Sequence, residues 1–183
     1  MKKIILILLF LAAFLERTVF DFGPNIELVT LAMLLASVYF GQKEAFWLTL
    51  AIMVAGDFVI GNTNIFLFTW SGFFIPVLFV GRFLKSHQSR GIKRVFTAAA
   101  AGVSSNLFFY FWTNFGVWLL DSWGMYSRDF SGLMSSYING LPFLKMQLTG
   151  TLIFVPLVFL ATESILSLYK RYQGRFGFRI GQL

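Results

Sequence analysis

Cysteine is absent from the 183 residues, and histidine occurs only once, as His87. The absence of cysteine excludes disulfide frameworks, thiolate metal sites and cysteine nucleophiles. His87 lies in the basic stretch GRFLKSHQSRGIKR, which is typical of a solvated loop, and it has no second histidine to work with. The sequence therefore predicts no metal and no cofactor, and it argues against an enzyme that depends on histidine chemistry.

Charge is also scarce. Charged residues make up 13% of the chain against 57% hydrophobic residues, 24 phenylalanines occur, and the mean hydropathy is +0.74. A soluble domain has about 25% charged residues, so this chain has too few to cover a surface that faces water. The composition indicates an all-α integral membrane protein.

Six apolar segments are long enough, or nearly so, for the roughly 20 residues that a membrane-spanning helix needs. They predict a single domain over residues 1–183, built as a bundle of six transmembrane helices. The first segment also resembles a signal peptide, but no A-x-A cleavage pattern follows it, and we interpret it as a span. The predicted spans are 4–20, 26–40, 45–60, 65–84, 95–120 and 146–168.

Most of the 15 lysines and arginines fall on the side of the predicted bundle that holds both termini. Because basic residues favour the cytoplasmic side, both termini are predicted to be cytoplasmic, in a multi-pass protein of the bacterial inner membrane. The net charge of +7 then belongs to the cytoplasmic face and indicates contact with anionic membrane lipids, not with nucleic acid.

The outer segment between the fifth and sixth spans is DSWGMYSRDFSGLMSSYINGLPFLK. We expect Gly132–Tyr137 to form a short interfacial helix that breaks at Gly140, with Pro142 starting the last span. Such a helix would either cover the outer mouth as a lid or pack passively at the membrane interface.

Polar and aromatic residues share one stripe near the outer end of the fifth span. Tyr110, Asn114, Trp118 and Asp121 follow each other at i, i+4, i+8 and i+11. Together these side chains could hold a small flat or hydroxylated solute. Two other interpretations stay open, namely that the aromatic residues form an interfacial belt and that Asn114 joins two helices by hydrogen bonds.

Asp57 falls in the last turns of the third span, where the helix dipole disfavours a carboxylate. Arg17, Arg128 or Lys145 could pair with it, and so could a ligand. The residues that we predict to bind a substrate are Asp57, Asn64, Tyr110, Asn114, Trp118, Asp121, Tyr126 and Arg128.

Two further acids suggest structural roles. Asn25 would cap the second span, which places Glu27 favourably in its first turn. Glu163 is expected to meet a cytoplasmic lysine or arginine. Ala32 and Ala36 form a small-xxx-small face that serves packing within the chain or docking of a second protein.

The run PNIELVTLAMLLASVYFGQKEAFWLTLAIMVAGDFVIGN resembles the second and third spans of the S components of energy-coupling factor (ECF) transporters. The likeness lies in the N-x-E opening, the glycine between the spans, and an acid followed by glycine. The elements TNFGVW, GLMSSY and LPFL resemble an uncharacterised family of S-component-like bacterial membrane proteins. The resemblance covers roughly residues 20–160.

This resemblance implies a six-helix subunit that captures a vitamin or related micronutrient from outside and works with a transmembrane coupling subunit and ATPase subunits. The chain has no G-x-x-x-x-G-K-[ST] loop, so a partner would have to hydrolyse the ATP. S components often carry an A-x-x-x-A docking face on the first span, where this chain has only Ala12 and Ala13.

Two other functions remain open. An intramembrane enzyme acting on a lipid-like substrate would have to use Asp57, Asp121 or Tyr126 as its acid or base. A noncatalytic membrane assembly protein would need none of these groups.

Overall fold

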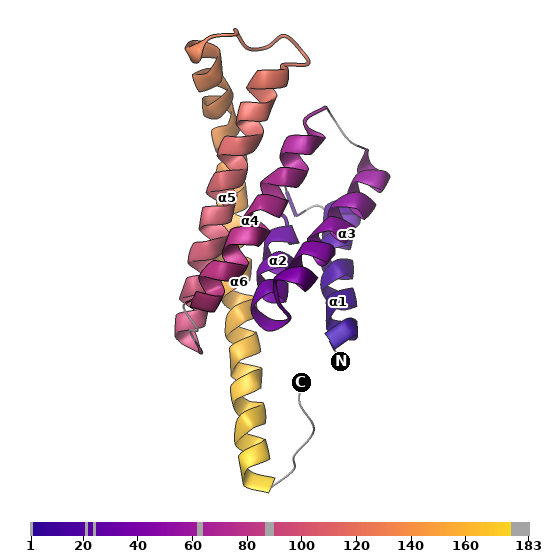
Figure 1. Cartoon of the computed structure of the whole chain (residues 1–183), viewed down its shortest axis with the longest axis vertical. Helices are drawn as coiled ribbons and strands as arrows, with labels where there is room; N and C mark the ends of the chain where they lie inside the picture. The colour runs from indigo at the N-terminus through magenta and orange to yellow at the C-terminus, as the bar shows by residue number, and fades with distance from the viewer. Residues whose placement is uncertain (1, 21, 24, 62–63, 87–89, 177–183) are drawn as a thin grey trace.

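A computed structural model describes residues 2–20, 22–23, 25–61, 64–86 and 90–176, and His87 lies outside them. All regular structure within these residues is helical (Figure 1). The elements are α1 (Lys2–Leu15), the π-helix η1 (Glu16–Phe20), α2 (Val29–Tyr39), α3 (Gln42–Ile60), α4 (Phe66–Ser86), α5 (Ile92–Leu120) and α6 (Phe130–Phe176).

Ion pairs show that α1 and α3 run in the same direction. Lys2 Nζ lies 2.6 Å from Glu44 Oε1 where both helices begin, and Arg17 Nη2 lies 2.8 Å from Asp57 Oδ1 where both end. The short α2 returns between them. We call the two ends of the bundle the Arg17 end and the Glu163 end, after the residues at their centres.

The other helices continue this alternation. At the Glu163 end, Arg94 at the start of α5 pairs with Glu163 of α6, while nearer the Arg17 end Tyr110 of α5 contacts Tyr137 of α6. Helices α5 and α6 are therefore antiparallel, and α1, α3 and α5 share one direction. The result is an up-down bundle, as short connections between successive helices favour.

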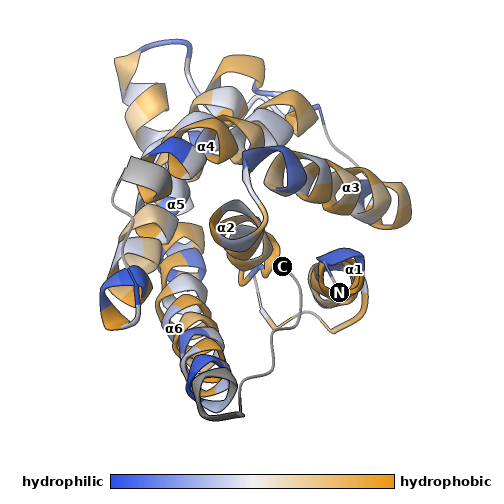
Figure 2. Cartoon of the chain, turned by 60° about the horizontal axis from the view of Figure 1, so that its bottom comes forward, coloured by the Kyte–Doolittle hydropathy of each residue, from blue (hydrophilic) through white to orange (hydrophobic). Residues whose placement is uncertain are grey.

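Helix α2 is the centre of the bundle, and it contacts all five other helices (Figure 2). Nine of its eleven residues are buried, including Val29, Met33 and Leu34 at 0% exposure. A helix that is apolar on all sides is expected to be buried in this way. Ala32 and Ala36 are also buried, so their small-residue face packs against the chain's own helices.

In the described part of the chain, three helical stretches are long and apolar enough to cross a membrane: Phe66–Leu84, Ile92–Leu120 and Phe130–Tyr172. Helix α2 is apolar but shorter. Large apolar side chains cover the outside of the bundle, as in Ile4 of α1 and Phe79 of α4, which are 61% and 63% exposed. The structure thus supports an all-helical membrane protein, whereas six crossings and the orientation of the termini stay predictions.

The predicted interfacial helix is wrong as a separate element, because Gly132–Tyr137 and the last span form one continuous helix, α6. The helix begins early because Asp129 Oδ1 accepts the Gly132 N–H at 2.8 Å, which caps its first turn. It continues through Pro142, whose missing N–H is tolerated in a membrane helix when neighbouring groups satisfy the backbone. Its 47 residues span about 70 Å and extend beyond the bundle (Figure 1).

The predicted start of the second span is also wrong. Helix α2 begins at Val29, with Leu28 at its N-cap and no side-chain cap. Asn25 adopts a left-handed φ of 59° and Glu27 lies before the helix. Glu27 is instead drawn to Arg17, because pairing a partly buried carboxylate with a cation outweighs the weaker attraction of a helix dipole.

Replacement of Gly102 tests the packing around α2. A Cβ atom there would lie 2.8 Å from Thr151 Cγ2 and 3.2 Å from Leu34 Cδ1, where α5 meets α6 and α2. We expect Gly102→Leu to destabilise the protein by about 1–3 kcal/mol through overpacking, measured as thermal unfolding in detergent. Ala100→Leu, at an exposed position of the same helix, is the matched control, and equal melting of the two variants would contradict this packing.

Candidate functional site

A partly buried cluster of polar and charged side chains surrounds Arg17. Its Nη1 atom donates to Glu27 Oε1 at 2.9 Å, and its Nη2 atom donates to Asp57 Oδ1 at 2.8 Å. Trp70 Nε1 of α4 donates to the other oxygen of Asp57 at 2.5 Å. Arg17, Arg128 and Lys145 were the predicted candidates to pair with Asp57, and the structure shows that Arg17 forms the ion pair. We call Glu16, Arg17, Glu27, Asp57 and Trp70 the Arg17 network.

Local backbone structure brings these groups together. The π-helix η1 follows α1 directly and carries Glu16 and Arg17 into the bundle, where Glu16 is 3% exposed. Such π turns occur frequently at functional sites. Glu16 Oε2 accepts the Leu28 N–H at 3.1 Å, which ties the start of α2 to the end of α1.

Gly56 of α3 makes room for the guanidinium. A Cβ atom at this position would lie 2.8 Å from Arg17 Cδ and 2.9 Å from Arg17 Nε. Since real side chains do not approach so closely, a side chain at position 56 would displace the Arg17 side chain from its present path to Asp57.

The Arg17 network is almost closed to solvent and is unevenly charged. The side chains of Arg17 and Asp57 are 10% and 7% exposed. Three carboxyl groups, those of Glu16, Glu27 and Asp57, surround the single guanidinium. Arg17 Nε and Glu27 Oε2 are buried and have no hydrogen-bond partner among the residues that the structure describes. Buried groups of this kind normally have partners, so both atoms call for an explanation.

Tyr110 and Asn114, which the sequence predicted to face a solute, lie where α5 packs on α6. The Tyr110 hydroxyl donates to the Tyr137 carbonyl at 2.6 Å, and the Asn114 amide donates to the Tyr110 carbonyl at 2.8 Å. Gly140 of α6 lies directly against the Asn114 side chain. The Asn114 amide thus donates within its own helix, and its side chain meets α6 by packing against Gly140. The bond that links α6 to this residue goes to its backbone, where the Ser136 hydroxyl donates to the Asn114 carbonyl at 3.2 Å.

Trp118, Asp121 and Arg128 close the end of α5. Arg128 donates to the carbonyls of Trp118 at 3.1 Å, of Leu119, and of Leu120 at 3.4 Å, which are among the last carbonyls of the helix and lack helical partners. Asp121, with a left-handed φ of 35°, accepts the Met125 N–H at 2.8 Å. A cation at a helix C-terminus also complements the helix dipole.

The connection from α5 to α6 is held by hydrogen bonds at both ends. Trp118 Nε1 donates to the Ser127 carbonyl at 3.0 Å, and the Ser127 hydroxyl donates to Asp129 at 2.7 Å. The Gly132 N–H and the Ser127 hydroxyl together hold the pKa of the Asp129 carboxyl below its usual value. The connection is therefore an ordered turn that caps two helices.

Asn64 and Tyr126 meet at a small cavity of about 10 Å³, which has room for about one water molecule. Asp121 and Ser122 also line it, and Asn64 Nδ2 donates to Ser122 Oγ at 2.5 Å. A vitamin-sized solute would need this cavity to open.

The eight predicted residues thus form three sets and do not surround a common space. Asp57 belongs to the Arg17 network, and Tyr110 and Asn114 belong to the contact of α5 with α6. The others lie at or against the end of α5 and the connection that follows it, with Asn64 reaching this connection from the turn before α4. Within the described residues α3 and α5 do not touch, and α4 packs against both. Of the eight, Asp57 alone lies in a buried ionic cluster.

Sequence reasoning missed a polar cluster in the middle of the bundle. Asn106 is 1% exposed, and its amide donates to Thr151 Oγ1 at 2.7 Å and to the Gln147 carbonyl at 3.2 Å. Thr30 of α2 donates to Asn106 Oδ1 at 3.4 Å. The sequence did contain a signal for this cluster, because Asn106 lies in the centre of the fifth predicted span. An asparagine at that depth needs a hydrogen-bond partner on a neighbouring helix.

Glu163 behaves as the sequence predicted. Its Oε1 atom accepts hydrogen bonds from Arg94 and from the Tyr39 hydroxyl, each at 2.7 Å, and its Oε2 atom accepts the Gly91 N–H at 2.7 Å. The Arg94 guanidinium also lies 5.5 Å from the centre of the Tyr39 ring. The prediction that a basic residue pairs with Glu163 is confirmed, and both of its oxygens are satisfied.

The chain belongs to DUF6580, a family of unknown function, whose model matches residues 1–173. Neither the curated proteins nor the solved structures include one with significant similarity to it.

Replacement of Arg17 tests how much its ion pairs contribute to the stability of the protein. Arg17→Leu would remove the guanidinium that pairs with Glu27 and Asp57, and breaking a buried ion pair costs about 3–5 kcal/mol. We expect a correspondingly large loss of thermal stability in detergent. The control is Lys2→Ala, which removes the exposed pair with Glu44 and should cost less than about 1 kcal/mol. Similar losses in both variants would show that the network is not buried.

Proposed function

We propose that the chain is the substrate-binding membrane subunit of an ECF-type importer, and that the Arg17 network is the centre of its site. The solute would be a vitamin or a related micronutrient. The observation that carries the proposal is a buried ionic cluster with three carboxyl groups around Arg17, in which two buried polar atoms have no hydrogen-bond partner among the described residues.

A buried ionic cluster of this kind contributes little to the free energy of folding. Desolvating an arginine and three carboxyl groups costs several kcal/mol per ion, and apolar residues of similar size often stabilise a core as well or better. Ionisable groups among membrane helices are rare, and they commonly mark pathways for solutes, ions or protons. The open hydrogen-bonding positions on Arg17 and Glu27 are where a polar solute would bind.

Aromatic rings next to the network support a solute with a planar ring. The Trp70 indole, which donates to Asp57, lies edge-on to Phe66 and Phe74, with ring centres 6.0 Å and 6.3 Å apart. Tryptophan faces also attract cations. A cluster of hydrogen-bond acceptors beside an indole suits a ring that carries hydrogen-bond donors.

Under the predicted topology the Arg17 end faces the exterior of the inner membrane and the Glu163 end faces the cytoplasm. Partner subunits would supply ATP hydrolysis and membrane coupling, since the chain has no phosphate-binding loop of its own. Ala32 and Ala36 are buried, so a coupling subunit would need a different surface.

The test is native mass spectrometry of protein purified in mild detergent, which looks for a retained small molecule. We expect the unaltered chain to retain one, and we expect Asp57→Asn and Glu27→Gln to weaken its binding by at least tenfold, since a hydrogen bond to a charged group is worth about 1.5–3 kcal/mol.

The matched control is Glu44→Gln, which removes a carboxylate at the opposite end of the bundle and should leave the affinity unchanged. Unfolding curves of all variants separate lost binding from lost structure. Unchanged affinity in both site variants would reject the site. Failure to retain any small molecule, together with one stable protein partner, would favour an assembly protein instead.

A further inference from the structure

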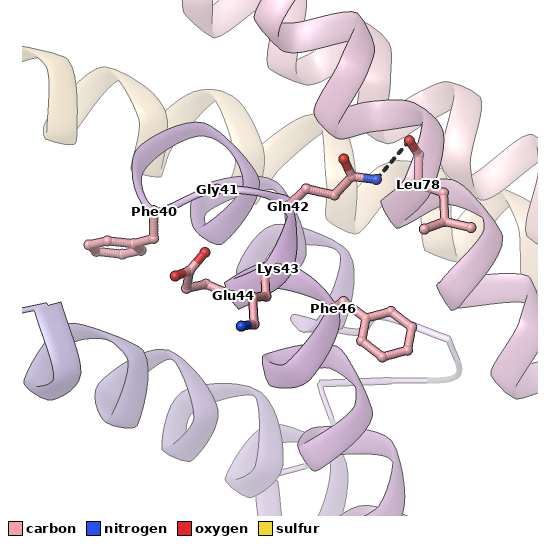
Figure 3. Close-up of a pocket in the computed structure, with 7 residues that line it drawn as sticks. All are labelled: Phe40, Gly41, Gln42, Lys43, Glu44, Phe46 and Leu78. Carbon is pink, nitrogen blue, oxygen red and sulfur yellow. Dashed lines mark hydrogen bonds between the residues drawn. The ribbon is translucent and has the colours of Figure 1, made fainter.

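Two neighbouring depressions lie where α2 turns into α3 at the Glu163 end. The larger, about 600 Å³, opens beside the turn (Figure 3), and the smaller, about 330 Å³, opens toward α1. Lys43 and Glu44 line both, so these two residues stand between the depressions. The larger is lined by Phe40, Gly41, Gln42, Lys43, Glu44, Phe46 and Leu78, and the smaller by Leu6, Lys43, Glu44, Trp47 and Leu48.

The two charged residues between the depressions are not equivalent. Glu44 is neutralised by Lys2, whose Nζ lies 2.6 Å away, and this hydrogen bond keeps the pKa of Glu44 below its usual value. Lys43 is exposed and forms no ion pair or hydrogen bond with any residue that the structure describes. Lys3, also exposed, follows Lys2 in the chain. The local charge is therefore positive, with Lys43 as its uncommitted cation.

The walls on both sides of Lys43 are largely apolar. Phe40, Phe46 and Leu78 form one wall, and in Figure 3 the side chains of Lys43 and Glu44 lie between the two phenylalanines. On the other side Trp47 is 57% exposed, as expected for an indole at a membrane interface. Gln42 donates to the Leu78 carbonyl at 3.0 Å and holds α3 to α4 at the rim.

We propose that this surface binds an anionic glycerophospholipid, with the headgroup phosphate on Lys43 and one acyl chain in each depression. A single cation between two apolar hollows matches a lipid that has one phosphate and two chains. Basic pockets between membrane helices bind anionic headgroups in this manner. A choline headgroup would bring a second cation close to Lys43 and would bind less well. The proposal does not depend on the transport function.

To test this, single lipids are added to delipidated protein in detergent. Thermal unfolding measures the melting temperature with each lipid, and native mass spectrometry counts the lipids that stay bound. We expect phosphatidylglycerol to bind and to raise the melting temperature more than phosphatidylcholine. Lys43→Gln should weaken phosphatidylglycerol binding about fivefold, the contribution of one basic residue near an anionic surface. Inorganic phosphate and single-chain lysophosphatidylglycerol should protect less than the two-chain lipid.

Lys93→Gln is the matched control, because Lys93 is an exposed lysine near the start of α5 at the same end of the bundle. Equal weakening in the Lys93 and Lys43 variants would overturn the proposal in favour of diffuse attraction. Equal protection by phosphatidylcholine, or by inorganic phosphate alone, would also overturn it. Since Lys43 is exposed, the variant is expected to fold, and its unfolding curve without lipid checks this directly.

Discussion

The arrangement of the N-terminal half depends on the interaction of Arg17 with Asp57 and Glu27. Among the residues that the structure describes, helix α1 contacts only α2, α3 and the π-helix that follows it, so it lies at the edge of the bundle. Apolar contacts within lipid give little preference for one helix neighbour over another, because lipid tails are as apolar as leucine side chains. A buried ion pair is directional, and breaking it would leave unpaired charges in an apolar bundle. It therefore specifies where α1 ends and how α2 and α3 meet it.

The amino-acid composition was sufficient to predict a helical membrane protein, and the apolar runs were sufficient to predict where most of its helices lie. The predicted spans 45–60, 65–84 and 95–120 lie within or closely match α3, α4 and α5, because long apolar runs leave few alternatives to a helix. The ion pairs of Asp57 and Glu163 could also be predicted, since an acid among apolar residues requires a cation and few cations were available. Each of these predictions depended on a single property of the local sequence, either a long apolar run or an acid among apolar residues.

The errors arose where tertiary contacts competed with local signals. Glycine and proline at positions 140 and 142 normally end a helix, but packing against Asn114 of α5 and an early cap at Asp129 extend α6 through them. Asn114, Trp118 and Asp121 looked like part of a ligand-binding stripe because their spacing places them near one face of α5. The spacing does not show which parts of the protein pack against that face. Here that face meets α6 and the connection that caps α5. Asn106 was overlooked for a related reason, because its partners come from α2 and α6.

The two ends of the bundle show why the Arg17 network is the stronger functional candidate. At the Glu163 end one acid meets one arginine, and both carboxylate oxygens are satisfied by Arg94, Tyr39 and the Gly91 N–H. At the Arg17 end three acids lie around one arginine, and Gly56 leaves room for the arginine side chain. Arg17 Nε and Glu27 Oε2 are buried there and have no hydrogen-bond partner in the described part of the chain. A network that serves only packing is expected to balance its charges and hydrogen bonds, as the Glu163 end does. The imbalance at the other end is the expected form of a site that a polar solute completes.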